Sequence, residues 1–72
     1  MSMELGVWLV HYEFARNLDE AERLCERGSI RLNGKAITNV HHIPEEGSSL
    51  SSLENAYTIL IPASSRKQYE IL

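Results

Sequence analysis

The chain has 72 residues, of which 43% are hydrophobic and 24% charged, and its formal net charge is −3 at pH 7. A chain of this length forms one domain and buries only about 60% of its unfolded surface, so we do not expect a substrate cleft of its own. No apolar run approaches the roughly 18 residues of a membrane span, so we expect no membrane partner. Residues 1–72 are therefore expected to form a single binding module cut from a longer protein.

Cysteine content indicates the compartment. Cys25 is the only cysteine, so no internal disulfide can form and a reducing interior is expected. The N-terminal stretch MSMELGV carries a glutamate and no lysine, unlike the basic region of a secretory signal. These features favour a cytoplasmic location.

The first predicted element is a helix over residues 4–14. Leu5, Trp8, Leu9 and Tyr12 follow the i, i+3, i+4, i+7 spacing of one helical face. Gly6 weakens this helix by about 1 kcal/mol relative to alanine.

A second helix is predicted from Leu18 to Arg27. Asn17 is a favourable N-cap, and Glu20 three residues later completes an arrangement that resembles a capping box. Gly28 is expected to end the helix. At 100° per residue the helix has three stripes. They are a buried face of Leu18, Ala21, Leu24 and Cys25, an acidic flank of Asp19, Glu22 and Glu26, and a basic flank of Arg23 and Arg27.

The strongest local signal is SIRL-NG-KAI, residues 29–37. Asn33-Gly34 between short apolar segments predicts a hairpin with a two-residue type I′ turn. This register pairs Ile30 with Ile37 and Leu32 with Lys35, and it directs Arg31 to the other face of the sheet with Ala36.

The rest of the chain predicts a long connection and two strands. Residues 38–55 form the connection, with turns at Pro44 and Gly47 and a mobile serine-rich part at 48–52. Residues 56–61 form a strand that Pro62 ends, and residues 68–72 form a last strand. The expected class is α+β, with two N-terminal helices packed on a small, mostly antiparallel sheet.

Side chains suited to catalysis or metal binding do not form a recognisable set. His11, His41, His42 and Cys25 lack the spacing of zinc ligands. Cys25 falls on the buried face of the second helix, where a structural thiol is expected. We therefore predict no catalytic residue, no metal and no cofactor in this chain.

Seven basic residues are the candidates for a binding surface. Five cluster around the second helix and the hairpin, and two lie in the loop before the last strand. They are Arg16, Arg23, Arg27, Arg31, Lys35, Arg66 and Lys67. If that loop folds back beside the hairpin, one continuous basic surface results, suited to nucleic-acid phosphates. The alternative is that Glu20, Glu22 and Glu26 neutralise the arginines through i, i+3 and i, i+4 pairs.

The segment NLDEAERLCERGSIRLNGK resembles the core of the S-four-like RNA-binding domain, whose fold contains an alpha-L motif. The resemblance rests on a polar cap at Asn17, the Glu20-Ala21 and Arg23-Leu24 pairs, Gly28, and residues 30–35. The C-terminal third, AYTILIPASSRKQYEIL, is similar to the closing hairpin of the tRNA-binding C-terminal domain of bacterial-type and mitochondrial tyrosyl-tRNA synthetases. Arg66, Lys67 and Tyr69 occupy the basic and aromatic places there.

Several positions depart from that pattern. Leu18, Glu22 and Glu26 stand where the family often carries lysine or arginine, and Glu13 replaces a common glycine after the first helix. Pro-Ala-Ser-Ser replaces a more basic lead-in to the last loop. These departures weaken the expected RNA surface on the second helix more than they affect the fold.

The resemblance implies a module that binds structured RNA, most specifically tRNA, beside the catalytic domain of a parent tyrosine–tRNA ligase. That ligase would bind ATP, whereas this chain alone would not catalyse aminoacylation. A mitochondrial location is then an alternative to the cytoplasm. Two other hypotheses remain: a protein-interaction or structural appendage that has lost RNA binding, and the S-four-like domain of a pseudouridine synthase or ribosome-associated factor.

Overall fold

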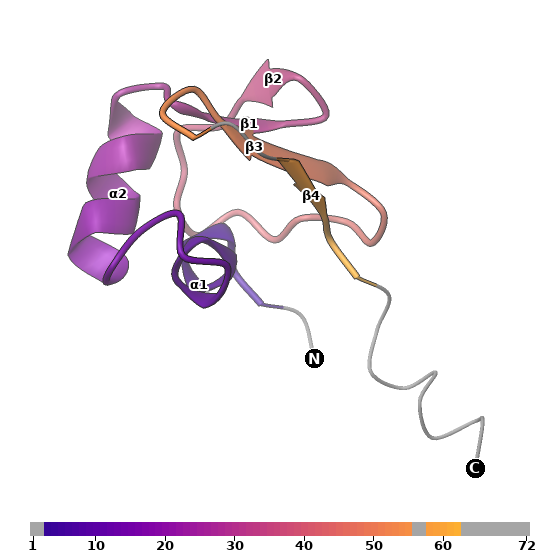
Figure 1. Cartoon of the computed structure of the whole chain (residues 1–72), viewed down its shortest axis with the longest axis horizontal. Coiled ribbons are helices and arrows are strands. Elements are labelled where there is room, and N and C mark those ends of the chain that lie inside the picture. The colour runs from indigo at the N-terminus through magenta and orange to yellow at the C-terminus, as the bar shows by residue number, and fades with distance from the viewer. Residues whose placement is uncertain (1–2, 56–57, 63–72) are drawn as a thin grey trace, which may run out of the picture.

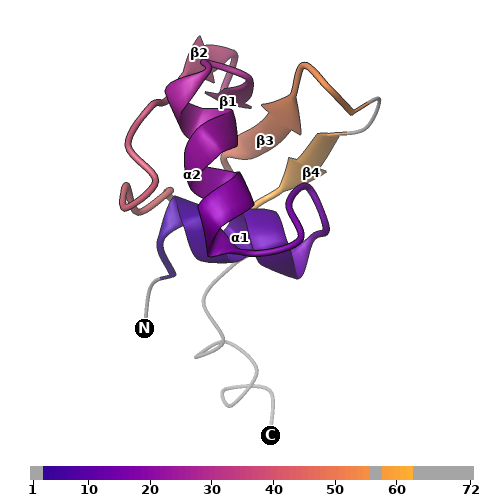
Figure 2. The same cartoon turned by 90° about the vertical axis from the view of Figure 1, so that its left-hand side faces the viewer.

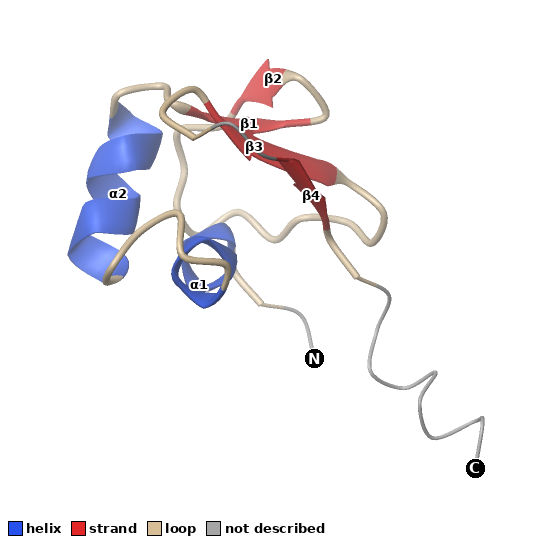
Figure 3. Cartoon of the chain, in the orientation of Figure 1, coloured by secondary structure: helices blue, strands red, loops and turns tan. Residues whose placement is uncertain are grey.

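The computed structural model describes residues 3–55 and 58–62, and within them two helices precede four strands (Figure 1). The helices are α1, Leu5–His11, and α2, Leu18–Glu26. The strands are β1, Ile30–Leu32, β2, Lys35–Ala36, β3, Ser49–Ser52, and β4, Thr58–Leu60. The helices gather on one side of the sheet (Figure 3), which confirms the predicted α+β class. The predicted last strand, 68–72, lies outside the described residues.

The described strands form one antiparallel sheet in the order β2-β1-β3-β4. Leu32 pairs with Leu50 and Leu50 with Ile59, so three apolar side chains form a row on the face that packs against the helices. The core contains Leu5 and Leu9 of α1, Ala21, Leu24 and Cys25 of α2, and Ile30, Leu32 and Leu50 of the sheet, together with Phe14, Ala15 and Ile61.

The prediction that residues 48–52 are a mobile loop is wrong. This segment contains β3, a central strand that pairs with β1 on one side and β4 on the other. Its residues alternate in burial, and Leu50 is fully buried while Ser49 and Ser51 lie on the opposite face. Serine is a weak strand former alone, but strand preference depends mainly on pairing and burial, which only the folded sheet supplies.

The Asn33-Gly34 turn is confirmed, with the predicted register. Both residues have positive φ, 53° and 81°, as a type I′ turn requires. Leu32 pairs with Lys35 and Arg31 with Ala36. Asn33 also joins the hairpin to β3, because its Oδ1 accepts a hydrogen bond from the Ser49 amide at 3.0 Å.

Helix α1 is shorter than predicted and ends at a residue with left-handed backbone. The Glu13 amide donates to Val10 O at 3.1 Å, and the Phe14 amide donates to Leu9 O at 2.8 Å. These two bonds form a Schellman motif in which Glu13 has φ 66°, a conformation that glycine adopts most easily. Phe14 then turns into the core instead of extending the helix.

The N-terminal end of α1 is capped by a distant segment of backbone. The amides of Leu5 and Gly6 donate to the carbonyl oxygens of His42 and Val40, at 2.7 and 2.9 Å. Figure 2 shows the segment after β2 running down to this end of α1. A Cβ at Gly6 would lie 2.5 Å from Val40 Cγ2, so the glycine that weakens the helix locally permits this approach.

The predicted cap and stop of α2 are confirmed, although the helix ends at Glu26, one residue before the predicted Arg27. Asn17 Oδ1 accepts a hydrogen bond from the Glu20 amide at 2.8 Å. Glu20 Oε1 in turn accepts a hydrogen bond from the Arg16 amide at 2.7 Å, whereas in a standard capping box it would accept from the amide of the N-cap residue, Asn17. The other end of α2 is a second Schellman motif, in which Gly28 has φ 77°. The Gly28 amide donates to Cys25 O, and the Ser29 amide donates to Leu24 O.

Candidate nucleic-acid interface

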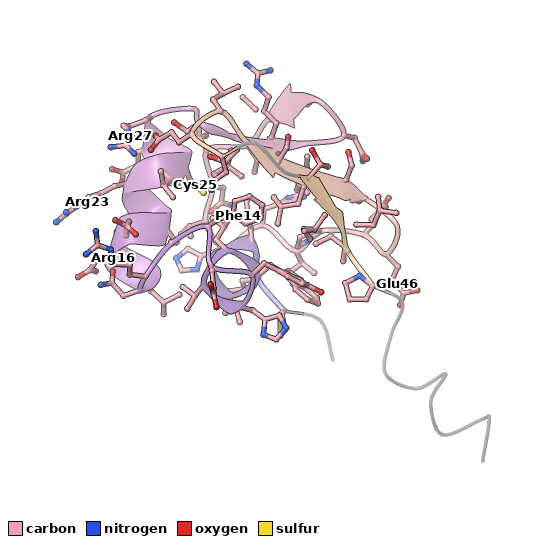
Figure 4. All side chains as sticks on the ribbon, in the orientation of Figure 1. Phe14, Arg16, Arg23, Cys25, Arg27 and Glu46 are labelled. Carbon is pink, nitrogen blue, oxygen red and sulfur yellow. The ribbon has the colours of Figure 1, made fainter. Side chains whose placement is uncertain are left out.

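Three of the predicted basic residues lie along α2. Figure 4 shows Arg16, Arg23 and Arg27 along the outward side of this helix, away from the core residues Phe14 and Cys25. All three arginines are exposed. The hydrogen bond that the Arg16 amide donates to Glu20 Oε1 fixes the backbone just before the helix, and so places Arg16 next to the first turn.

Arg27 is paired, but with a residue of the turn that follows β3 rather than of its own helix. Its Nη2 lies 2.6 Å from Glu54 Oε2, which also accepts a hydrogen bond from Ser29 Oγ at 2.9 Å. The side chains of Arg27 and Glu54 are 56% and 47% exposed, so the pair is well solvated and contributes about 0–1 kcal/mol. The guanidinium remains accessible to a ligand.

Within residues 3–55 and 58–62, no ion pair joins Arg16 or Arg23 to a carboxylate. The predicted alternative, neutralisation by the helix glutamates Glu20, Glu22 and Glu26, is therefore not seen among the described side chains. Arg16 and Arg23 are thus exposed, with no described carboxylate within ion-pair distance of either guanidinium group.

The hairpin carries the other described candidates, Arg31 and Lys35. Arg31 lies on the sheet face opposite to the buried Ile30 and Leu32, between Ala36 and Ser51 of the neighbouring strands. Its Nη1 donates to Gly34 O at 3.2 Å, and its Nε is buried without a partner among the described residues. Lys35 is exposed on β2. The remaining candidates, Arg66 and Lys67, lie outside the described residues, as does the loop that was expected to join these groups.

A pocket of about 190 Å³ opens on the other flank of α2, and sequence reasoning missed it. It lies where α1 and α2 begin and where the turn at Val40-His41 passes them. Its lining residues are Glu4, Gly6, Val7, Leu18, Asp19, Glu22, Val40 and His41. The sequence does not predict this pocket, because Val40 and His41 belong to a connection that has no helical or strand periodicity.

The prediction that Leu18 belongs to the buried face of α2 is wrong. Ala21, Leu24 and Cys25 are buried as expected, but Leu18 is 58% exposed and lines the pocket. It is the first residue of the helix and projects beyond the core, so the helical pattern places it on the right stripe but cannot show where the core ends.

Cys25 does not have the properties of a nucleophile. Its side chain is fully buried, and burial, followed by the nearby charges of Glu22 and Glu26, raises the pKa of its thiol to about 11. In the part of the chain that the structure describes, no group of three His, Cys, Asp or Glu side chains could hold a metal ion. None of the described helices is long and apolar enough to cross a bilayer.

Comparison with known proteins identifies no relative: no protein-family model matches the chain, and no curated protein sequence is significantly similar to it.

Proposed function

We propose that this chain is an RNA-binding module that recognises structured RNA through phosphate contacts. The observation that carries the proposal is the exposed flank of α2, where the guanidinium groups of Arg16 and Arg23 have no ion-pair partner among the described residues. Arg27 adds a third, solvated cation to this flank. Guanidinium groups bind phosphate with two parallel hydrogen bonds, so arginine suits this contact.

The local geometry of residues 17–35 supports the same proposal. The capped helix, the Gly28 stop and the type I′ turn hold the helix and the hairpin in one fixed relationship. Arg23 and Arg27 on the helix and Lys35 on the hairpin are thus presented by rigid elements. Such contacts position a nucleic acid without reading its bases, so selectivity would come from the shape of the RNA.

The finer proposal is that the RNA is tRNA and that the parent protein is a tyrosine–tRNA ligase, in the cytoplasm or in mitochondria. It rests on the resemblance of residues 17–35 and 56–72 alone. The parent's catalytic domain would then be the second partner of this module.

The test is a titration of structured tRNA at several salt concentrations. Three phosphate contacts predict a log–log salt slope of about −2 to −3, at roughly −0.7 to −0.9 per phosphate. The variant Arg16→Ala/Arg23→Ala should bind more weakly and reduce the slope by about 1.5 units. The matched control Arg16→Lys/Arg23→Lys keeps both charges and should keep most of the slope.

Absence of salt-dependent binding at low ionic strength would contradict the proposal, as would equal binding by the alanine variant. The titration should also include an unrelated structured RNA. Equal affinity for it would retain RNA binding and remove the assignment to tRNA.

A further inference from the structure

The pocket beside α2 has features that RNA binding does not use. It is formed by three separate parts of the chain: the first residues of α1, the first turns of α2, and the turn at Val40-His41. Its volume of about 190 Å³ is below the roughly 300–1,000 Å³ of sites for drug-sized ligands and cofactors. A pocket of this size suits one long side chain rather than a cofactor.

Part of the pocket wall is apolar and exposed. Val7 is 40% exposed and Leu18 58% exposed, and the partly buried Val40 completes this wall. Covering such side chains is favourable, by about 25 cal/mol for each Å² removed from water. An aliphatic chain is therefore the natural occupant of this wall.

The polar part of the lining is acidic. It contains the carboxylates of Glu4, Asp19 and Glu22, against one imidazole, that of His41. Glu4 Oε1 lies 2.7 Å from His41 Nδ1, so this carboxylate has a partner. Neither Asp19 nor Glu22 has a cation within ion-pair distance among the described residues. The pocket consequently favours a cationic occupant and repels phosphate.

We propose that this pocket binds one lysine or arginine side chain of a partner protein, at a site flanked by apolar residues in that partner. The aliphatic stem lies on Val7, Leu18 and Val40, and the charged group lies toward Asp19 and Glu22. Lysine and arginine combine these two properties, a stem that covers apolar surface and a charged tip that stays near solvent. Charge complementarity of this kind selects partners more than it adds affinity.

Two lining residues on α2 give this pocket its character. Leu18 supplies apolar wall and Glu22 supplies negative charge. Basic residues at both positions would remove the complementarity. The part of the acidic flank that lines the pocket, Asp19 and Glu22, is then a protein-binding surface, distinct from the basic flank that carries Arg23 and Arg27.

The test uses amide NMR with the full chain and the peptide acetyl-Leu-Arg-Leu-amide. We expect saturable shifts at the amides of Val7, Leu18, Glu22 and His41, with a Kd of about 1 mM, as is typical of small ligands. The matched peptide with citrulline in place of arginine keeps the shape and loses the charge. It should bind at least about fivefold more weakly.

Paired variants separate a local site from net charge. Asp19→Asn/Glu22→Gln should weaken peptide binding about tenfold. Glu26→Gln/Glu45→Gln removes the same charge outside the pocket and should leave the Kd within about twofold, because distant surface charges are screened. All four positions are exposed, so both variants should retain the amide spectrum of the folded chain.

Any of the following results would overturn the proposal. No shift at the pocket amides up to 10 mM peptide, or equal effects of the two double variants, would show that no local cation site exists. Equal binding of the citrulline peptide would indicate an uncharged apolar occupant. Pocket amides that shift with protein concentration alone would indicate that a second copy of the chain occupies the pocket. Pocket amides that shift in the variant Arg66→Ala/Lys67→Ala without peptide would indicate that this chain's own basic residues occupy it. The peptide titration contains no RNA, so its result is independent of the tRNA titration.

Discussion

The amide nitrogen of Gly6 lies 2.9 Å from the carbonyl oxygen of Val40, and a Cβ at Gly6 would lie 2.5 Å from Val40 Cγ2. The contact joins the start of α1 to a turn more than thirty residues later, and both residues line the acidic pocket. The local preference of a helix for alanine therefore competes here with a tertiary contact.

We predict that Gly6→Ala destabilises the protein by about 1–2 kcal/mol, although alanine is the better helix former by about 1 kcal/mol. The added methyl group must displace Val40, whose β-branched side chain has few alternative rotamers. Urea denaturation measures the change. In a Val40→Ala background the clash is absent, so Gly6→Ala should become neutral or stabilising; an equal loss in both backgrounds would contradict this explanation.

Glu13→Gly should stabilise the protein by about 1 kcal/mol, because Glu13 has φ 66° and a side chain in the left-handed region costs about 1–2 kcal/mol. The control is Glu13→Gln, which removes the charge but keeps the strained backbone and should change stability little. Thermal unfolding compares them, and equal stabilisation by both substitutions would assign the effect to charge.

The Cys25 thiol should react with iodoacetamide at pH 8 at least about 100-fold more slowly in the folded protein than in urea, because reaction requires opening of the core. Burial raises the pKa of this thiol to about 11 in the folded state, from 9.0. Above pH 9 the unfolded chain loses this proton and the folded chain retains it, so the contribution of Cys25 to stability should fall between pH 9 and pH 11. Cys25→Ala should lose this part of the pH dependence. Rapid alkylation under native conditions would contradict the burial.

The pKa of His41 should be higher than that of an ordinary histidine, because its Nδ1 is hydrogen-bonded to Glu4, whose charge adds to the effect. The protonated form is favoured in the folded state, so any stability from this pair is present below the ordinary pKa, about 6.5, and is lost as pH rises through the raised value. An NMR titration should show the pKa of His41 falling in Glu4→Gln. An unchanged value in that variant would exclude the pair in solution.

Amide exchange should be slow at the paired amides of β3, Ser49–Ser52, to a degree comparable with β1. The measurement distinguishes a central strand from the mobile loop that the serine-rich composition suggests. Fast exchange throughout residues 49–52, with β1 protected, would mean that β3 does not form in solution.

Sequence alone determines the local elements of this protein. Three local features depend only on hydrogen bonds and φ values within a few residues: the cap at Asn17, the stop at Gly28 and the turn at Asn33-Gly34. A short stretch of sequence is therefore enough to predict each of them. The positions of Arg23 and Arg27 on one exposed flank of α2 follow from helical periodicity in the same way.

Tertiary structure decides the features that join distant segments. Strand β3 exists because β1 and β4 pair with it and Leu50 enters the core, which four residues of mostly serine do not indicate. The Arg27–Glu54 pair joins residues that are 27 positions apart in the sequence. The pocket joins the starts of α1 and α2 to the irregular turn at Val40-His41. Such contacts leave no periodic pattern in the sequence, because their geometry is set by how the helices pack on the sheet rather than by the backbone preferences of neighbouring residues.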